Sequence, residues 1–401
     1  MKYVIFLGDG MADDPQASLG GLTILEKAQT PNMDRIAHEG ACGLLVTVPE
    51  GMPPDSTVAN LSVMGYNPHE CLEGRGVLEA AAMGVDIGPH DHAMRMNIIN
   101  VSDGMIRTHS AGNISTPEAA ELIKALRNQL VYDGVEYHTG VSYRHVLKLT
   151  RPASKAIICA PPHDHLDEPM EKYLPVASAP EGEATAALLR EIVQKSNAIL
   201  ENHPVNVARA EGGEQKANYC WPWSIGKRPK MKSFMEMFGV TGAVVSAVDL
   251  IRGIGVYAGM DTIVVEGATG LWNTNYEGKA DAALKLLENH DLVYIHVEGP
   301  DEAGHEGSIE LKIRAIEELD RRLIARVMKG VTEPTRFAIL PDHYTPIKVR
   351  THVGLPVPFA IMGAGITPDA VKVYTEKTCA TGSIGTLKGI EFMQRFIGRA
   401  P

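Results

Sequence analysis

Three short apolar runs in this chain each end in an aspartate. The runs, with the residues that close them, are "YVIFLGDG" (3–10, Asp9), "LVYIHVEGPD" (292–301, Asp301) and "RFAILPDH" (336–343, Asp342 and His343). Apolar, β-branched runs that alternate with helical patterns are typical of the buried strands of an α/β sheet. A further run, "VPFAIMGAG" (357–365), predicts a fourth strand of the same kind.

Ligands of open α/β sheets bind beyond the carboxyl ends of the strands, so these acids could converge in one crevice. Any single aspartate after a strand has a simpler explanation, because aspartate often caps the helix that follows. Three such aspartates, two of them with a histidine close behind, favour a shared site over three separate caps.

The stretch "VEGPDEAGHEGS" (297–308) places Asp301 four positions before His305. In a helix these positions share one face, so a carboxylate and an imidazole could bind one cation. On this window alone, a helix N-terminus that favours acidic residues is the simpler explanation. One more histidine, His352, stands in "KVRTHVG". Carboxylates with three imidazoles suit Mn, Zn or Mg, and their number predicts a site for two divalent ions.

A candidate nucleophile lies in "GMPPDSTVANLSVMGY" (51–66), where Asp-Ser-Thr precedes a helical pattern. A plain helix N-cap explains these residues as well. The same position, however, is where phosphate oxygens bind, and a metal can lower the pKa of a serine hydroxyl. Beside a two-metal site, Ser56 is the predicted nucleophile.

The motifs "PPDST", "GPDEAGHEGS", "LPDHYTP" and "RTHVGLPVPF", together with Asp9, resemble those of the alkaline phosphatase superfamily. Within it, the chain is similar to the archaeal-type cofactor-independent phosphoglycerate mutases. The segments that carry this likeness are "GRGVLEAAAMG" (74–84), "AMRMNIINV" (93–101), "YRHVL" (143–147) and "GATGLWNTNYEGKA" (267–280). The resemblance implies an α/β fold, with an open, mixed, mostly parallel sheet flanked by helices and a second, inserted α/β domain that caps the substrate.

The resemblance also implies roles for individual residues. One metal would be bound by Asp301, His305 and His352, and the other by Asp9, Ser56, Asp342 and His343. Ser56 would accept the phosphoryl group during interconversion of 2-phosphoglycerate and 3-phosphoglycerate, without 2,3-bisphosphoglycerate as cofactor. The resemblance places His109 near the phosphoryl group. Further charge for binding an anion could come from Arg75, Arg95, Arg144 and Lys230, although each of these four could equally be a surface side chain.

The metal-type residues divide the chain into a discontinuous core domain, 1–105 with 275–401, and an inserted domain, 106–274. We expect the inserted domain to close over the substrate and exclude water, and "HDHLDE" (163–168) to be a solvated loop within it. The chain departs from the family pattern at Asn113, where an arginine is common, and in 219–234. Both departures fall in the predicted substrate domain.

Three other functions remain open. A phosphotransferase, of the kind proposed as homoserine kinases among bacterial relatives, could use the same scaffold, although no GxxxxGK[ST] loop occurs. A metal-dependent phosphatase or phosphodiesterase would result if water reached the phosphoserine. A non-enzymatic binding module would not explain why seven residues of the kinds that bind metals are expected to converge.

The formal net charge of -11 argues against broad binding to nucleic acid or to an anionic membrane. A small anionic substrate remains compatible, because metal ions can reverse the local field. The five cysteines are scattered and include no CxxC pair, which fits a reducing compartment. The first apolar run is too short for a signal sequence, and no stretch approaches a membrane span. We therefore expect a cytoplasmic protein.

Overall fold

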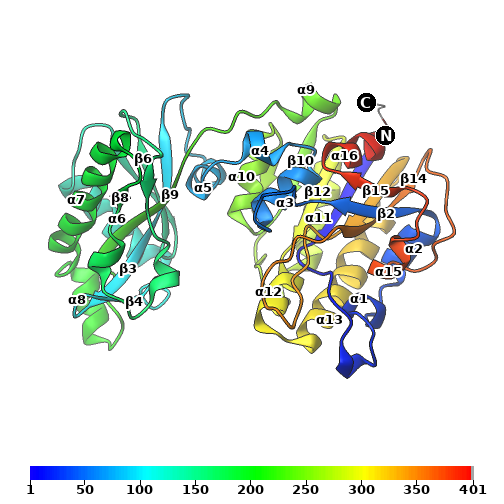
Figure 1. The fold of residues 1–401 in the computed structure, drawn as a ribbon, viewed down its shortest axis with the longest axis horizontal. Helices are drawn as coiled ribbons and strands as arrows, with labels where there is room; N and C mark the ends of the chain where they lie inside the picture. The colour runs from blue at the N-terminus through cyan, green and yellow to red at the C-terminus, as the bar shows by residue number, and fades with distance from the viewer. Residues whose placement is uncertain (399–401) are drawn as a thin grey trace. The chain divides into compact units, whose positions relative to one another are not determined.

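The computed structural model describes residues 1–398, which divide into two compact units (Figure 1). Unit 1 consists of residues 1–72 and the chain from residue 230 onward, and unit 2 of residues 73–229. The unit boundaries thus lie at 72/73 and 229/230, not at the expected 105/106 and 274/275.

Strand pairing explains the displaced boundaries. β3 (His92–Ser102) pairs with β6 (Arg144–Leu149) and β9 (Tyr219–Lys227), which ties its segment to unit 2. β10 (Gly242–Val245) pairs in parallel with β12 (Leu292–Val297), which ties its segment to unit 1. The paired strands are far apart in the sequence, so their pairing cannot be predicted from the spacing of the candidate metal ligands.

Unit 1 is built on an eight-stranded sheet with the order β11-β10-β12-β1-β13-β14-β2-β15. The strands not yet bounded are β1 (Lys2–Gly8), β2 (Gly40–Val46), β11 (Asp261–Ile263), β13 (Thr335–Leu340), β14 (Val357–Gly363) and β15 (Gly385–Lys388). Within residues 1–398, the antiparallel neighbours in this sheet are those of β14, which runs against both β13 and β2. The predicted mixed, mostly parallel sheet is confirmed, but the fourth run is not parallel to the other three.

Helices cover both faces of this sheet. The α-helices of unit 1 in the described chain are α1 (Ile24–Lys27), α2 (Pro31–His38), α3 (Ser56–Val63), α4 (Pro68–Cys71), α9 (Phe234–Phe238), α10 (Asp249–Tyr257), α11 (Tyr276–Leu287), α12 (Gly299–Glu306), α13 (Ile309–Glu318), α14 (Ala325–Gly330), α15 (Glu376–Cys379) and α16 (Ile390–Ile397). Helices α2, α11 and α13 share one apolar core with Val4 and Phe6 of β1. Helix α3 contacts both α10 and α16 on the other side (Figure 1). Because both faces are covered, β1 is apolar at nearly every position.

The three strands that end in acids are neighbours in this sheet. β1 lies between β12 and β13 and is parallel to both, with Leu7 opposite His296 and Leu340. Their carboxyl ends therefore meet at one edge, as the sequence predicts.

Unit 2 contains a five-stranded antiparallel sheet in which β3 pairs with β4 (Met105–Thr108), β6 and β9, and β6 pairs with β5 (Val135–Val141). Its helices are α5 (Arg75–Ala82), α6 (Thr116–Gln129), α7 (Glu183–Leu200) and α8 (Pro204–Glu211). The helix expected in "TPEAAELIKALRNQL" is α6, which begins with a capping box formed by Ser115 and Glu118. Helices α6 and α7 share one apolar core with β3 and lie together on the sheet (Figure 1).

Among residues 1–398, no helix combines the length and the apolar content that crossing a bilayer requires.

A buried histidine should make unit 2 sensitive to acid. Burial lowers the pKa of His145 on β6 to about 3 from an ordinary value of 6.5. The unfolded chain binds this proton below about pH 6.5 and the folded chain only near pH 3, so stability falls as pH falls through that window. Over one pH unit inside it, this residue should cost about 1.4 kcal/mol.

The measurement is urea unfolding at pH 6.5, 5.5 and 4.5, followed by tryptophan fluorescence, because Trp221 and Trp223 lie in unit 2. His145→Gln should show a smaller loss of stability on acidification than the parent chain. His90→Gln, which alters an exposed histidine of unit 2, serves as control and should not. Equal pH dependence in all three proteins would contradict the assignment.

Candidate metal centre

The structure brings the aspartates at the ends of β1, β12 and β13 together with two histidines. Two groups form, Asp301 with His343 and His352, and Asp9 with Asp342 and His343. In each group one ligand atom per residue lies within 4.8 Å of the others. His343 belongs to both groups and is fully buried, as is Asp342. The two groups thus form one continuous cluster of oxygen and nitrogen donors.

Asp301 and His305 lie on the first two turns of α12, four positions apart, as predicted. Nε2 of His305 lies 3.1 Å from Oδ2 of Asp301 and 3.0 Å from Nε2 of His352. The family resemblance implies that His305, not His343, belongs to the group with Asp301 and His352. In the structure both imidazoles are within reach of that group.

The hydroxyl of Ser56 lies against the same cluster. Ser56 is the first residue of α3, and the side chain of Asp55 caps the helix by accepting from the N–H of Thr57 at 2.7 Å. Oγ of Ser56 lies 3.2 Å from Nε2 of His343. A serine at this position faces the positive end of the helix dipole. The helix start predicted from "PPDST" is confirmed.

Hydrogen bonds from the protein orient the carboxylates and imidazoles of the cluster. Oδ1 of Asp342 accepts from the N–H of Gly10 at 3.1 Å and from the N–H of His343 at 2.9 Å. The hydroxyl of Thr345 donates to Oδ1 of Asp301. Backbone carbonyl groups contact the second ring nitrogens of His305 and His352. Nδ1 of His305 lies 3.0 Å from the carbonyl of Arg350, and Nδ1 of His352 lies 3.1 Å from the carbonyl of Pro54. Partners of this kind orient imidazole ligands in metal sites.

His296 supports the cluster and was missed by the sequence reasoning. It lies on β12 and is buried. Its Nε2 lies 2.9 Å from Oδ2 of Asp9, and its Nδ1 lies 3.2 Å from Oγ of Ser246. The signal that could have found it is a lone histidine in "LVYIHV", an otherwise apolar strand that ends beside the predicted site. Its contact with Asp9 makes it an orienting partner of that carboxylate.

The electrostatics of the cluster call for added positive charge. Burial, followed by the charges of Asp342 and Asp301, raises the pKa of Asp9 well above its usual range. Burial also disfavours the charged form of Asp301. Hydrogen bonds with His305 and His352 outweigh this effect of burial and lower the pKa of Asp301. The hydrogen bond with Asp301 raises the pKa of His305 to about 9.

The donor set fits divalent cations. Oδ1 of Asp9 is buried, lies 3.4 Å from Nε2 of His343 and accepts no hydrogen bond within the described part of the chain. A buried carboxylate oxygen without a donor is costly unless a cation binds it. Carboxylates and imidazoles together match Mn, Zn or Mg.

Four of the five predicted substrate contacts gather in unit 2. Arg95 is buried, and its Nη1 donates to Oε1 of Glu79 at 2.8 Å. Burial lowers the pKa of Arg95, and the nearby charges of Arg75 and Arg144 lower it further. Burial and then Arg95 lower the pKa of His109, whose Nδ1 is buried without a partner in the described residues. These side chains form a basic cluster.

His163 contacts this basic cluster from the segment 163–168, whose residues are mostly exposed, as expected for a solvated loop. Its ring packs edge-on against His109 and Trp223, with centroids 5.9 and 5.4 Å apart. The sequence could not reveal this neighbour because it stands in a Pro-rich stretch without a periodic pattern. Lys230, the fifth predicted contact, is an exposed residue of unit 1 and is not part of the unit 2 cluster.

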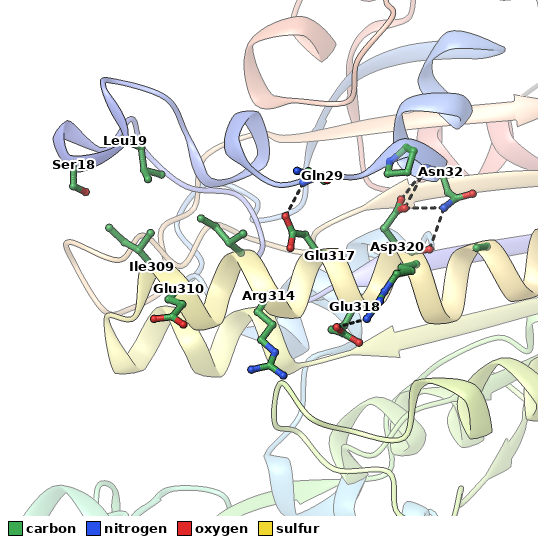
Figure 2. Close-up of a pocket in the computed structure, with 14 residues that line it drawn as sticks. Ser18, Leu19, Gln29, Asn32, Ile309, Glu310, Arg314, Glu317, Glu318 and Asp320 are labelled. Atoms are coloured by element: carbon green, nitrogen blue, oxygen red, sulfur yellow. Dashed lines mark hydrogen bonds and ion pairs between the residues drawn. The ribbon is translucent and has the colours of Figure 1, made fainter.

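A hollow of about 990 Å³ on unit 1 is lined by none of the metal-type residues (Figure 2). Several of its charged side chains already have partners. Oε1 of Glu317 accepts from the N–H of Gln29 at 2.9 Å, Asp320 accepts from the side chain of Asn32 at 2.7 Å, and Arg314 packs over Trp272. We therefore locate the chemistry in the metal-type cluster, not in this hollow.

Comparisons with known proteins show which family the chain belongs to. A family model described as 2,3-bisphosphoglycerate-independent phosphoglycerate mutase matches residues 37–206. A protein of that name from Methanosarcina barkeri is 46% identical over 397 residues, covering 98% of each chain. One named as a probable member from Geobacter sulfurreducens is 45% identical and covers both chains completely.

The chain belongs to the 2,3-bisphosphoglycerate-independent phosphoglycerate mutase family. Solved structures support the fold of this mutase family. A protein from Pyrococcus horikoshii has a TM-score of 0.84 at 31% identity, covering 100% of this chain and 98% of its own. The cofactor-independent phosphoglycerate mutase from Thermoplasma acidophilum has a TM-score of 0.69 at 27% identity, covering 99% of each. The resemblance of the sequence to the mutase family is confirmed.

Substituting candidate ligands should distinguish the two groups of metal-type residues. His352→Ala should weaken Mn²⁺ binding at one site, and His343→Ala at both, because only His343 belongs to both groups. We expect a loss of affinity of roughly 100-fold or more per affected site, since even orienting partners contribute 10- to 100-fold.

Titration calorimetry with Mn²⁺ and elemental analysis of the recovered protein measure this effect. His38→Ala, at an exposed position on α2, is the matched control and should bind as the parent chain does. Unchanged stoichiometry and affinity in both ligand variants would remove these histidines from the site.

Proposed function

We propose that the chain interconverts 2-phosphoglycerate and 3-phosphoglycerate through a phosphoserine at Ser56. The observation that carries this proposal is the serine hydroxyl at the start of α3, 3.2 Å from Nε2 of His343 and beside two groups of metal-type ligands. Membership in the mutase family supports the substrate.

Two divalent cations would be bound by Asp9, Asp301, His305, Asp342, His343 and His352, together with Ser56. Such ions, when bound, neutralise phosphoryl charge and favour ionised oxygen at the attacking and leaving positions. Mn, Zn and Mg all suit these donors.

The residues of the chain itself supply position and a nucleophile. Oγ of Ser56 forms a bond to phosphorus while the bond from phosphorus to the glycerate oxygen breaks, and the proton lost by serine is balanced by the proton that glycerate gains. The neighbouring hydroxyl of the same glycerate then attacks the phosphoserine, which regenerates Ser56. Positioning and charge stabilisation dominate the barrier of such transfers.

The basic cluster of unit 2 supports binding of an anion. The cluster contains three guanidinium groups and two imidazoles, those of Arg75, Arg95, Arg144, His109 and His163. Guanidinium groups bind phosphate and carboxylate through paired hydrogen bonds. We propose that these residues bind the charged groups of phosphoglycerate. Exclusion of water by the inserted unit would distinguish a mutase from a phosphatase. The cytoplasm remains the predicted compartment.

Ser56→Ala should abolish turnover and leave the cations bound, because six other residues hold them. We expect a fall in kcat of roughly 10³-fold or more, as for other covalent nucleophiles. Conversion of 3-phosphoglycerate is followed through enolase, and metal content is measured on the same preparation. Ser62→Ala, on the same helix and buried, is the matched control and should keep near-parental turnover. A near-parental rate for Ser56→Ala would remove this serine from the mechanism.

A paired assay separates the mutase from a kinase or phosphatase. The metal-loaded chain is offered 3-phosphoglycerate with enolase, ATP with homoserine, and 3-phosphoglycerate with detection of free phosphate. We expect product in the first assay and less than about one percent as much in the other two. Product only in the second assay would establish a phosphotransferase, and phosphate release alone a phosphatase.

A further inference from the structure

Two buried side chains link strand β12 to the helix that carries the serine. The hydroxyl of Tyr294 on β12 donates to Oδ1 of Asn60 on α3 at 2.5 Å. Nδ2 of Asn60 donates to Oδ2 of Asp342 at 2.8 Å and to the carbonyl of Ser56 at 2.8 Å. The side chains of Tyr294, Asn60 and Asp342 have no exposed surface. One amide group therefore contacts both the residue that bears the nucleophile and a metal-type carboxylate.

We propose that Asn60 and Tyr294 are positioning residues, and that Tyr294 acts by fixing which way the Asn60 amide points. Asn60 would hold Ser56 and Asp342 at one separation during phosphoryl transfer. This inference deepens the proposed function and rests on it for its catalytic part, whereas its effect on cation binding stands independently.

The orientation of an asparagine amide is set by its hydrogen-bond partners, because its two ends have nearly the same shape. Nδ2 of Asn60 serves two oxygen acceptors, so the flipped amide would place oxygen against oxygen at both contacts. Tyr294 excludes the flip by donating to the oxygen end. Burial and the charges of Asp342 and Asp9 raise the pKa of Tyr294, which keeps its hydroxyl protonated as the donor.

The carboxylate of Asp342 depends on this amide for its second oxygen. Oδ1 is held by the N–H groups of Gly10 and His343 at 3.1 and 2.9 Å. Oδ2 accepts a hydrogen bond from Nδ2 of Asn60 and lies 3.5 Å from Nε2 of His343. Loss of the Asn60 contact would leave a buried carboxylate oxygen without its neutral donor, which is costly in a low-dielectric site.

A double-mutant cycle tests whether Tyr294 acts through Asn60. The variants are Tyr294→Phe, Asn60→Ala and both together, made in the full-length chain. Mn²⁺ affinity is measured by calorimetry without substrate, and kcat and KM are measured with 3-phosphoglycerate. Tyr374→Phe is the matched control, because Tyr374 is fully buried and donates to the carbonyl of Pro358 at 2.9 Å outside the cluster.

We expect Tyr294→Phe to lower kcat about tenfold or more with little change in KM, and to weaken Mn²⁺ binding about tenfold at one site. Asn60→Ala should do the same or more. The double variant should be no worse than Asn60→Ala alone, because partners in one network are not additive. Tyr374→Phe should lower the melting temperature of the metal-free protein as much as Tyr294→Phe does, yet leave both kcat and Mn²⁺ affinity unchanged.

The inference is overturned if Tyr294→Phe changes only the melting temperature, as the control does. It is also overturned if the losses from Tyr294→Phe and Asn60→Ala multiply in the double variant, which would show independent roles. If the parent chain has no mutase activity, the proposed function fails, and the affinity cycle with Mn²⁺ alone then decides the positioning role. Circular dichroism establishes that each variant is folded before it is scored.

Discussion

Concentrated negative charge at the carboxyl edge of the sheet is the constraint on which the rest of unit 1 depends. Parallel pairing of β1 with β12 and β13 brings Asp9, Asp301 and Asp342 to one edge, where all three are buried. Buried like charges at short range oppose folding unless positive charge compensates them. Part of this compensation comes from the positive end of α3 and from three imidazoles, those of His305, His343 and His352. Bound divalent cations would complete it.

The supporting residues give this cluster its geometry. Strand β12 presents Tyr294 and His296 two positions apart, hence on the same face. Tyr294 reaches Asp342 through Asn60, and His296 contacts Asp9 directly. An otherwise apolar strand thus orients two carboxylates, each with its own partner. The helix that carries Ser56 is joined to the same network through Asn60, which is why we propose that cation binding and the position of the nucleophile are coupled.

The sequence predicts the strands, the start of α3 and the convergence of the three acids, because those features follow from local patterns and from the edge rule for parallel sheets. It does not predict the direction of β14, since an apolar run carries no direction. The unit boundaries were wrong because long-range pairing of β3 and β10 decides them. His296 was missed because a buried polar residue within an apolar strand resembles core.

The stoichiometry of cation binding by the parent chain tests the central claim most directly. The chain is stripped with a chelator, titrated with Mn²⁺ in a calorimeter, and its metal content is then determined by elemental analysis. The charge cluster predicts two Mn²⁺ ions per chain and a rise in melting temperature on binding. A chain that binds no Mn²⁺, Zn²⁺ or Mg²⁺ and keeps the same melting temperature would contradict the account.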